Sequence, residues 1–412
     1  MTADLIERQD QLLALYDLAR SFRSQLGLDA VLGTLAREAA RLVGTAAASA
    51  LLLTPAGPVV AHGGARPGTA PPIDDTTMLG LFEVPRADRR ELLLQAGDLP
   101  DLLPPGVASL LCLPIDVRDD IAAGLVLVNK PGGFASPDVK LAQAIAEQAG
   151  RQIEITLLHE ENLRQARFRA ELDLAARIQI RLLPQRVPPA RGLDVYARSH
   201  PALQVGGDFY DFITRPGHSW MFTVGDVAGK GMSAALMMSR IHAVIHNAAK
   251  FMPAPTPATV LRRVNEDLYD DFTEVGLFAT TFLGQYEPES RTLRFANAGH
   301  APVIHRAVGR EPVLLEADGT AIGVLPFAPW ADRALVLAPG DLVVAASDGL
   351  SEASDAAGAM FGHERLFRLT VELADLPARA IGEAILAAVE QFAVGATSDD
   401  DRTLVVIKGV PA

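Results

Sequence analysis

The apolar residues of the N-terminal third recur first at helical spacing and then in short continuous runs. Residues 12–22 and 28–42 each carry leucines on one helical face, which predicts two amphipathic helices. Apolar runs bounded by turn residues predict buried strands at 46–53, 59–61, 109–117 and 121–129. The Gly- and Pro-rich stretch 62–106 is expected to form loops with two short helices, around 76–82 and 89–96.

A long helix is predicted next, because residues 151–183 contain neither glycine nor proline. At about 1.5 Å per residue, such a helix is about 50 Å long. Its second half carries a heptad-like seam of Phe168, Leu172, Ala175, Gln179 and Leu182. Glu161 and Arg164 interrupt this pattern upstream. Two interpretations therefore stay open: a surface helix packed on a neighbouring domain, and a parallel helical dimer.

Beyond Pro184 the chain alternates between strand-like and helix-like segments. Strands are predicted at 220–224, 281–286, 292–297, 335–337, 342–346 and 404–407. Helices are predicted at 232–250, 257–271 and 376–391. Strands interleaved with helices favour a mixed sheet that is covered by helices on its faces.

Composition narrows the class of protein. With 412 residues the chain is long enough for two domains, and its net charge of −13 argues against a protein that coats nucleic acid. There is no apolar run of about 18 residues and no basic N-terminal start, so neither membrane contact nor a signal peptide is expected. The single cysteine, Cys112, is expected to be a buried small hydrophobe rather than a reactive thiol. A cytoplasmic protein without disulfides is the resulting prediction.

Four short segments of the C-terminal half place an aspartate next to glycine or another acid. The aspartates are Asp208, Asp226, Asp348 and Asp400. Hard divalent cations prefer carboxylate and carbonyl oxygens, and glycine lets the backbone approach a metal closely. Two such ions can share one water, lower its pKa and direct it at a phosphorus atom. An aspartate beside a glycine is also typical of turns, so spacing alone leaves both interpretations open.

Seven segments between residues 171 and 408 occur in an informative order. They are ELDLAARIQIRLL, VGGDFYD, GDVAGKGMSAALMM, FATTF, ANAGHAP, SDGLSEA and DDRT. In this order they resemble the SpoIIE-like branch of the PPM protein phosphatases. The resemblance implies a β-sandwich flanked by helices, with two Mn²⁺ or Mg²⁺ ions at one end. It also implies hydrolysis of phosphoserine or phosphothreonine on proteins.

The same resemblance implies which groups hold the metals. Carried over motif by motif, the ligands are Asp208, Asp226, the Val227 carbonyl, Asp348 and Asp400. Asp226 would bridge both ions, and water activated between them would attack phosphorus without a phosphoenzyme. Asp399 and Asp401 flank the last ligand, so the fourth carboxylate stays open by one position.

Two further positions bear on catalysis. Larger relatives place a histidine after the bridging aspartate, where this chain has Ala228. The group that protonates the leaving oxygen is therefore not identified. Asn297 and His300 belong to the ANAGHAP segment, and we interpret them as structural or site-supporting rather than catalytic.

Residues 12–158 resemble a GAF domain, through LGLDAVLGTLAREAARLVGTAAASALLL and SLLCLPIDVRDDIAAGLVLVNKPGGFASPDVKLAQAIAEQAG. GAF domains are sensory or dimerising modules, so the resemblance implies either a small-molecule ligand or a purely structural role. Neither Cys112, in a predicted strand, nor His62, in a predicted loop, suits attachment of a tetrapyrrole. Asn129 and Lys130 carry only the beginning of a nucleotide-binding motif.

Together these features predict an α+β protein in three parts. A GAF-like sensory or dimerisation domain covers 1–158, a helical linker 159–184, and a phosphatase domain 185–412. The resemblance implies a phosphoprotein substrate, a STAS-type anti-sigma-factor antagonist, and a homodimer. The helix 151–183 is hypothesised to couple the two domains. Two alternatives remain, a pseudophosphatase and a GAF-based sensor, both of which act through protein interaction alone.

Overall fold

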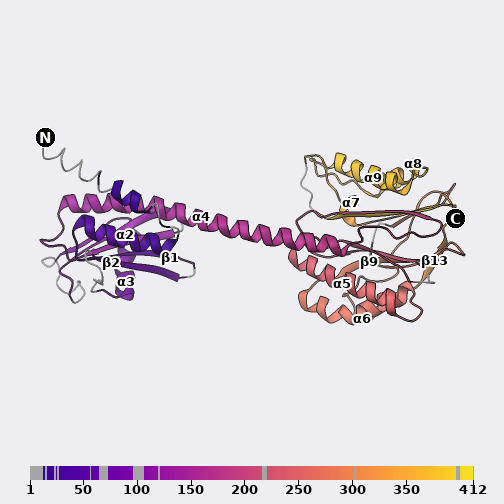
Figure 1. Cartoon of the computed structure of the whole chain (residues 1–412), viewed down its shortest axis with the longest axis horizontal. Helices are drawn as coiled ribbons and strands as arrows, with labels where there is room; N and C mark the ends of the chain where they lie inside the picture. Colours follow the sequence, from indigo (N-terminus) through magenta and orange to yellow (C-terminus); the bar gives the residue numbers. More distant parts are fainter. Residues whose placement is uncertain are drawn as a thin grey trace. The chain divides into compact units, whose positions relative to one another are not determined.

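The computed structural model describes residues 13, 16–22, 25, 27–55, 57–64, 73–95, 106–118, 121–215, 220–300, 303–395 and 400–411. The chain divides into two compact units, Met1–Phe168 and Arg169–Ala412 (Figure 1). Leu12 and Leu15 of the first predicted helix, and Asp399, lie outside the described residues. None of the described helices is both long enough and apolar enough to cross a membrane.

The first unit is built on one antiparallel sheet with strand order β2-β1-β5-β4-β3. Its strands are β1 (Ala47–Thr54), β2 (Gly57–Gly64), β3 (Leu92–Gln95), β4 (Ser109–Arg118) and β5 (Ile121–Val128). Helix α2 (Leu28–Val43) packs against one face, and α3 (Asp75–Asp88) against the other. Alternate residues of β1 enter the two apolar clusters, because successive side chains of a strand point to opposite faces.

Two sequence predictions in this unit are wrong. Residues 92–95 form strand β3 rather than a helix, because α3 ends at Arg89 (φ 51°) and the leucines that follow pair with β4. His62 lies in β2 rather than in a loop. Its imidazole is 2.8 Å from Ser49 Oγ through Nδ1 and 3.0 Å from Asp75 Oδ1 through Nε2.

The candidate ligand-binding residues of this unit make structural contacts. Cys112 is fully buried, as predicted, and burial raises the pKa of its thiol to about 12. Asn129 Oδ1 accepts a hydrogen bond from Ala108 N at 2.7 Å. Lys130 Nζ donates to the Val43 carbonyl at the end of α2, at 2.6 Å. These contacts fix the loops around the sheet.

Helix α4 (Ser136–Leu182) runs without interruption for 47 residues, so the predicted long helix is confirmed, and it also includes residues 136–150. Its N-terminal part buries Ile145 and Ile153 in the core of the first unit. Gln179 does not belong to a seam that faces a second helix, contrary to what the heptad spacing predicts. Its side chain is only 7% exposed and donates a hydrogen bond to the Gly206 carbonyl within the second unit. Phe168 of the same seam is exposed.

The second unit contains two antiparallel sheets. The first has the order β13 (Arg333–Val336), β10 (Thr292–Ala298), β9 (Ala279–Glu287), β8 (Trp220–Val227) and β7 (Phe209–Ile213). The second has the order β12 (Val313–Leu314), β11 (Val303–Arg306), β14 (Leu342–Ala346), β15 (Arg402–Gly409) and β6 (Leu193–His200).

The two sheets pack face to face and are covered by helices on their outer sides. Aromatic residues of β7, β8 and β9 meet aliphatic residues of β14 and β15 between the sheets. Helices α5 (Met232–Phe251) and α6 (Pro257–Val275) cover the first sheet, and α7 (Asp348–Ser351), α8 (His363–Glu372) and α9 (Ala378–Phe392) the second. Figure 1 shows these helices on opposite sides of the sandwich.

The single mixed sheet that strand and helix spacing predicts is therefore wrong, and the sandwich that the family resemblance implies is confirmed. The reason lies in the connection between β8 and β9, where the two predicted helices pack on each other as a pair instead of covering the sheet as separate crossovers. A helical pair returns the chain to the end of the sheet that it left, so Val227 at the end of β8 pairs with Ala279 at the start of β9. A single crossover helix would have made the strands parallel.

Candidate active site

The four predicted aspartates lie at neighbouring strand ends of the two sheets. Asp208 immediately precedes β7, and Asp226 is the second-last residue of β8, the antiparallel neighbour of β7. Asp348 follows β14 by two positions, and Asp400 precedes β15 by two, and these strands are also neighbours. The structure thus brings the four segments to one end of the sandwich.

The loop before Asp208 approaches the end of β8 closely. Val227 N donates a hydrogen bond to the Gly207 carbonyl at 3.2 Å. A Cβ atom at Gly207 would lie 2.5 Å from the Val227 carbonyl oxygen and 3.0 Å from Asp226 Oδ1. Only glycine fits there without displacing these oxygens. The Val227 carbonyl and the Asp226 carboxylate therefore lie on the same side of this loop.

Asp401 holds the same loop from the opposite sheet. Its Oδ2 accepts hydrogen bonds from Gly207 N at 2.7 Å and from Asp208 N at 3.4 Å. Its Oδ1 accepts one from Ala202 N at 2.8 Å. Both carboxylate oxygens of this buried residue are therefore engaged by backbone donors.

Asp400 has a different environment from Asp401. Its charge contributes to raising the pKa of both Asp226 and Asp348, so its carboxylate belongs to the acid cluster. Its Oδ2 also lies 3.5 Å from Lys230 Nζ. Both described candidates for the fourth carboxylate act on the other acids, since Asp401 also raises the pKa of Asp226. They differ in their hydrogen bonds, because Asp401 engages both carboxylate oxygens with the loop before Asp208, whereas Asp400 Oδ1 accepts from the N–H of its neighbour Asp401.

Burial and mutual repulsion raise the pKa values of three of these aspartates. Burial has the largest effect on Asp208, and the charges of Asp226 and Asp401 add to it, so its pKa lies well above the usual range. The pKa of Asp226 rises to about 7, through burial and then through Asp348 and Asp400. The pKa of Asp348 is raised by burial and by Asp400. This end of the sandwich concentrates negative charge that nothing in the described residues neutralises fully.

These residues fit divalent cations by their chemistry. Asp208 Oδ2 is buried and has no hydrogen-bond partner among the described residues. The donor set consists of oxygens, which Mg²⁺ and Mn²⁺ prefer, and bound cations would relieve the repulsion between the acids. Within the described ranges, no three His, Cys, Asp or Glu side chains are already arranged to hold an ion.

A cavity of 190 Å³ opens at the acid cluster and contains His300. Asp226 and Asp348 line it, together with Glu352 and His363. His300 is 1% exposed, and burial lowers the pKa of its imidazole to about 4, so the ring is neutral at pH 7.

The NAGH turn that carries His300 is held by Asn297. Asn297 Oδ1 accepts from His300 N at 2.7 Å, and its Nδ2 donates to the His300 carbonyl at 2.5 Å. A further bond from Nδ2 reaches the Leu315 carbonyl at 3.1 Å. Asn297 therefore has a structural role, which fits the sequence interpretation.

Sequence reasoning did not single out Lys230, Glu352 or His363, all of which lie at this end of the sandwich. Lys230 belongs to the GDVAGKG segment and Glu352 to SDGLSEA, so their positions inside recognised segments could have marked them as site residues. His363 follows Gly362 outside every recognised segment. Only the fold brings it to the cavity.

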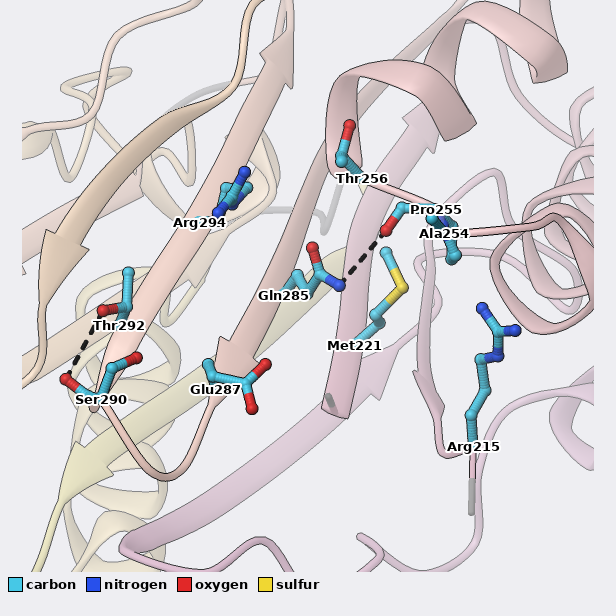
Figure 2. A pocket seen from close by; sticks show the side chains of 10 residues that line it. All are labelled: Arg215, Met221, Ala254, Pro255, Thr256, Gln285, Glu287, Ser290, Thr292 and Arg294. Carbon is cyan, nitrogen blue, oxygen red and sulfur yellow. Dashed lines mark hydrogen bonds between the residues drawn. The ribbon is translucent and has the colours of Figure 1, made fainter. Parts of the chain in front are cut away.

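A larger cavity of 530 Å³ lies at the opposite end of β8 and β9. Met221 and Gln285 form its floor, and Arg215, Glu287 and Arg294 surround it (Figure 2). Its residues include none of the four aspartates. The chemistry of the acid cluster, and not cavity size, therefore identifies the candidate active site.

Comparison with known families gives the class of protein. Residues 216–409 match stage II sporulation protein E (SpoIIE), and residues 27–153 match the GAF domain. The chain thus carries a GAF domain followed by a SpoIIE-type PP2C domain.

Individual relatives agree with this assignment. The chain is 31% identical over 189 residues to phosphoserine phosphatase RsbU of Bacillus subtilis (strain 168), which covers 46% of this chain and 55% of that protein. It is 26% identical over 222 residues to protein IcfG of Synechocystis sp. (strain ATCC 27184 / PCC 6803 / Kazusa), covering 48% of this chain and 35% of that protein. The chain therefore matches about half or less of the length of these relatives.

A solved structure supports the fold of the second unit. The SiaA-PP2C domain of Pseudomonas aeruginosa superposes with a TM-score of 0.54 at 26% sequence identity. The match covers 59% of this chain and 98% of that domain.

Proposed function

We propose that this protein is a metal-dependent serine/threonine protein phosphatase under the control of its GAF domain. The observation that carries the proposal is the acid cluster: four segments from two sheets place carboxylates so close that burial and neighbouring charges raise the pKa values of Asp208, Asp226 and Asp348. Such a cluster is unfavourable unless cations bind it. The phosphatase domain that contains it and the name of the relative RsbU support the same conclusion.

In this proposal two ions, Mn²⁺ or Mg²⁺, are held by five groups. The ligands are Asp208, Asp226, the Val227 carbonyl, Asp348 and Asp400. When bound, the ions would activate water and neutralise charge on the phosphate. Asp401 keeps the first loop in position through its three backbone hydrogen bonds. Lys230 adds a positive charge beside Asp400, where the phosphate would enter.

The test is hydrolysis of p-nitrophenyl phosphate by the full-length chain with and without Mn²⁺. Asp226→Asn is expected to abolish turnover, because the position proposed to bridge the ions loses its charge. Asp270→Asn, at an exposed position of α6, is the matched control and should keep wild-type turnover. A wild-type chain that shows no metal-dependent turnover with either Mn²⁺ or Mg²⁺ would favour the pseudophosphatase alternative.

For the physiological substrate we propose a phosphorylated STAS-type anti-sigma-factor antagonist. The proposal follows from the resemblance to the SpoIIE-like phosphatases and from the similarity to RsbU. The Asp226→Asn variant should retain a phosphorylated partner that the wild type releases. Mass spectrometry of proteins that are retained by the variant, with and without prior phosphatase treatment, identifies the class.

We further propose that α4 mediates a homodimer and couples a ligand of the GAF domain to the active site. Ile155, Leu163 and Phe168 are apolar yet exposed on this helix, which suits a contact with a second copy. Replacing Leu163 and Phe168 with serine should shift the full-length chain from dimer to monomer in light scattering. An insertion of two to four residues near Gln165 should change regulation but leave each unit folded.

A further inference from the structure

Departure of a serine or threonine alkoxide requires a proton, and the segment after Asp226 does not supply one. Val227, Ala228 and Gly229 have no titratable side chain. Lys230 is the first that does, and its ammonium group lies 3.5 Å from Asp400. The proton donor has to come from another element around the cavity.

Most other groups that line the cavity are unsuited to this role. His300 is buried and neutral at pH 7, and its Nδ1 lies 3.0 Å from Thr280 Oγ1. Ser351 Oγ donates to the Asp348 carbonyl at 3.1 Å. Glu352 contributes to raising the pKa of Asp348, and its own contribution to catalysis is tested separately by the Glu352→Gln variant. His363 is the remaining candidate.

His363 is positioned for contact with both the cavity and solvent. It is the first residue of α8, it is exposed, and it lines the cavity together with Asp226 and Asp348. Imidazole is the side chain whose proton exchange falls near neutral pH. Exposure to solvent lets the ring recover a proton after each turnover.

The segment before His363 is fixed to the segment that follows Asp348. Gly362 N donates to the Ser351 carbonyl at 2.8 Å, and Phe361 N donates to the Ala353 carbonyl at 2.8 Å. Gly362 adopts φ 79°, a left-handed conformation that favours glycine and directs the chain into α8. These backbone bonds therefore hold the start of α8 beside the segment that follows Asp348.

We propose that His363 is a catalytic residue that protonates the leaving oxygen of the substrate; this rests on the phosphatase function proposed above. The oxygen of water forms a bond to phosphorus while the bond from phosphorus to the serine or threonine oxygen breaks. The bonding electron pair goes to that oxygen, which takes the proton of the His363 imidazolium. The attacking water gives up one proton to solvent, and His363 takes one from solvent. The products are the free hydroxyl group and hydrogen phosphate.

The experiment compares substrates whose leaving groups differ in their need for a proton. A nitrophenolate leaves unassisted, whereas phenolate leaves less readily and a serine alkoxide requires protonation. The full-length wild type, His363→Gln and Glu364→Gln are assayed in Mn²⁺ on p-nitrophenyl phosphate, phenyl phosphate and a phosphoserine peptide. Glu364 is the matched control, because it is the exposed neighbour of His363 on α8 and does not line the cavity.

His363→Gln should lose roughly 100-fold or more in kcat on the phosphoserine peptide, as expected for loss of a general acid, and little on p-nitrophenyl phosphate. Glu364→Gln should match the wild type on all three substrates. Added imidazole should restore part of the peptide activity of His363→Ala. The role of His363 would be overturned if His363→Gln lost the same factor in kcat on all three substrates, or lost no activity at all. It would also be overturned if Glu352→Gln, and not His363→Gln, showed the loss that depends on the leaving group. A wild type inactive on all three substrates would count against the phosphatase function itself.

Discussion

Gln179 and Gly206 are joined by two hydrogen bonds that connect the end of α4 to the active-site loop. Gln179 Nε2 donates to the Gly206 carbonyl at 2.7 Å, and Gly206 N donates to Gln179 Oε1 at 3.0 Å. Gly206 is followed by Gly207 and Asp208, whose backbone N–H groups are held by Asp401. The loop of the first candidate ligand is thus fixed from two sides.

Replacing Gln179 with leucine should loosen this loop, because the buried N–H and carbonyl groups of Gly206 would both lose their hydrogen bonds to the side chain. The free energy of unfolding should fall by about 1–3 kcal/mol. The Mn²⁺ concentration for half-maximal activity should rise several-fold. Urea unfolding and a metal titration measure both effects. Gln185→Leu is the control, since Gln185 is exposed and bonds only to the carbonyls of Ile180 and Leu183; equal effects in the two variants would contradict the prediction.

Substitution by asparagine should affect turnover at Asp400 and stability at Asp401. Asp400→Asn should abolish metal-dependent turnover with little change in stability, because its carboxylate faces the acid cluster. Asp401→Asn should lower the free energy of unfolding by about 1–3 kcal/mol, because backbone donors lose a charged acceptor. Turnover assays and urea unfolding of both variants separate the two roles. Unimpaired turnover in Asp400→Asn would move the fourth ligand to a neighbour.

Gly207→Ala should impair catalysis by displacing the oxygens beside it. A Cβ atom there would lie 2.5 Å from the Val227 carbonyl oxygen, so the loop has to move. A shift of about 1 Å in a catalytic group costs roughly 100-fold in rate. Gly80→Ala in the middle of α3, where an added Cβ meets nothing within 4 Å, should leave turnover unchanged. Initial rates on p-nitrophenyl phosphate test this, and normal turnover in Gly207→Ala would refute it.

His300 should make stability depend on pH below neutrality. Its pKa is about 4 in the folded protein, below its usual value of 6.5, so the unfolded chain binds a proton that the folded chain does not. The contribution of neutral His300 is fully present above pH 6.5 and is lost as pH falls toward 4. Between pH 7 and pH 5 the loss is about 2 kcal/mol.

The measurement is urea unfolding of the wild type and His300→Gln at both pH values. The variant is expected to be less stable at pH 7 but to lose less stability on acidification. Comparison of the two pH differences cancels titrations that both proteins share. Identical pH differences would show that His300 does not titrate in this way.

Local pattern predicted the elements of this fold better than it predicted their pairing. The long α4 and the helices α5 and α6 follow from helical periodicity and from the positions of glycine and proline. Strand direction did not follow, because helical periodicity does not show that α5 and α6 pack as a pair and return the chain to the end of the sheet that it left. Strand β3 was mistaken for a helix, since three leucines in a row fit either structure until a partner strand is known.

The aspartates could be proposed from sequence because each lies in a recognisable segment. The sequence leaves the choice between Asp400 and Asp401 open, because two adjacent acids fit the same segment and the pattern does not show what each side chain contacts. Gln179 appeared to belong to a helical seam, and its partner Gly206 is a loop residue without a periodic pattern. His363 is brought to the cavity by a backbone contact that no sequence spacing records.

The contact between Asp401 and the loop before Asp208 also has a consequence for how the protein is made. The backbone N–H of Ala202 donates its hydrogen bond to Asp401, which lies 199 positions further along the chain. That residue immediately precedes β15, the last strand, which is inserted between β14 and β6. A ribosome must therefore synthesise Asp401 before this residue can hold the loop. A nascent chain that stops before Asp401 would lack this acceptor, and proteolytic removal of Asp401 together with β15 would release the loop before Asp208.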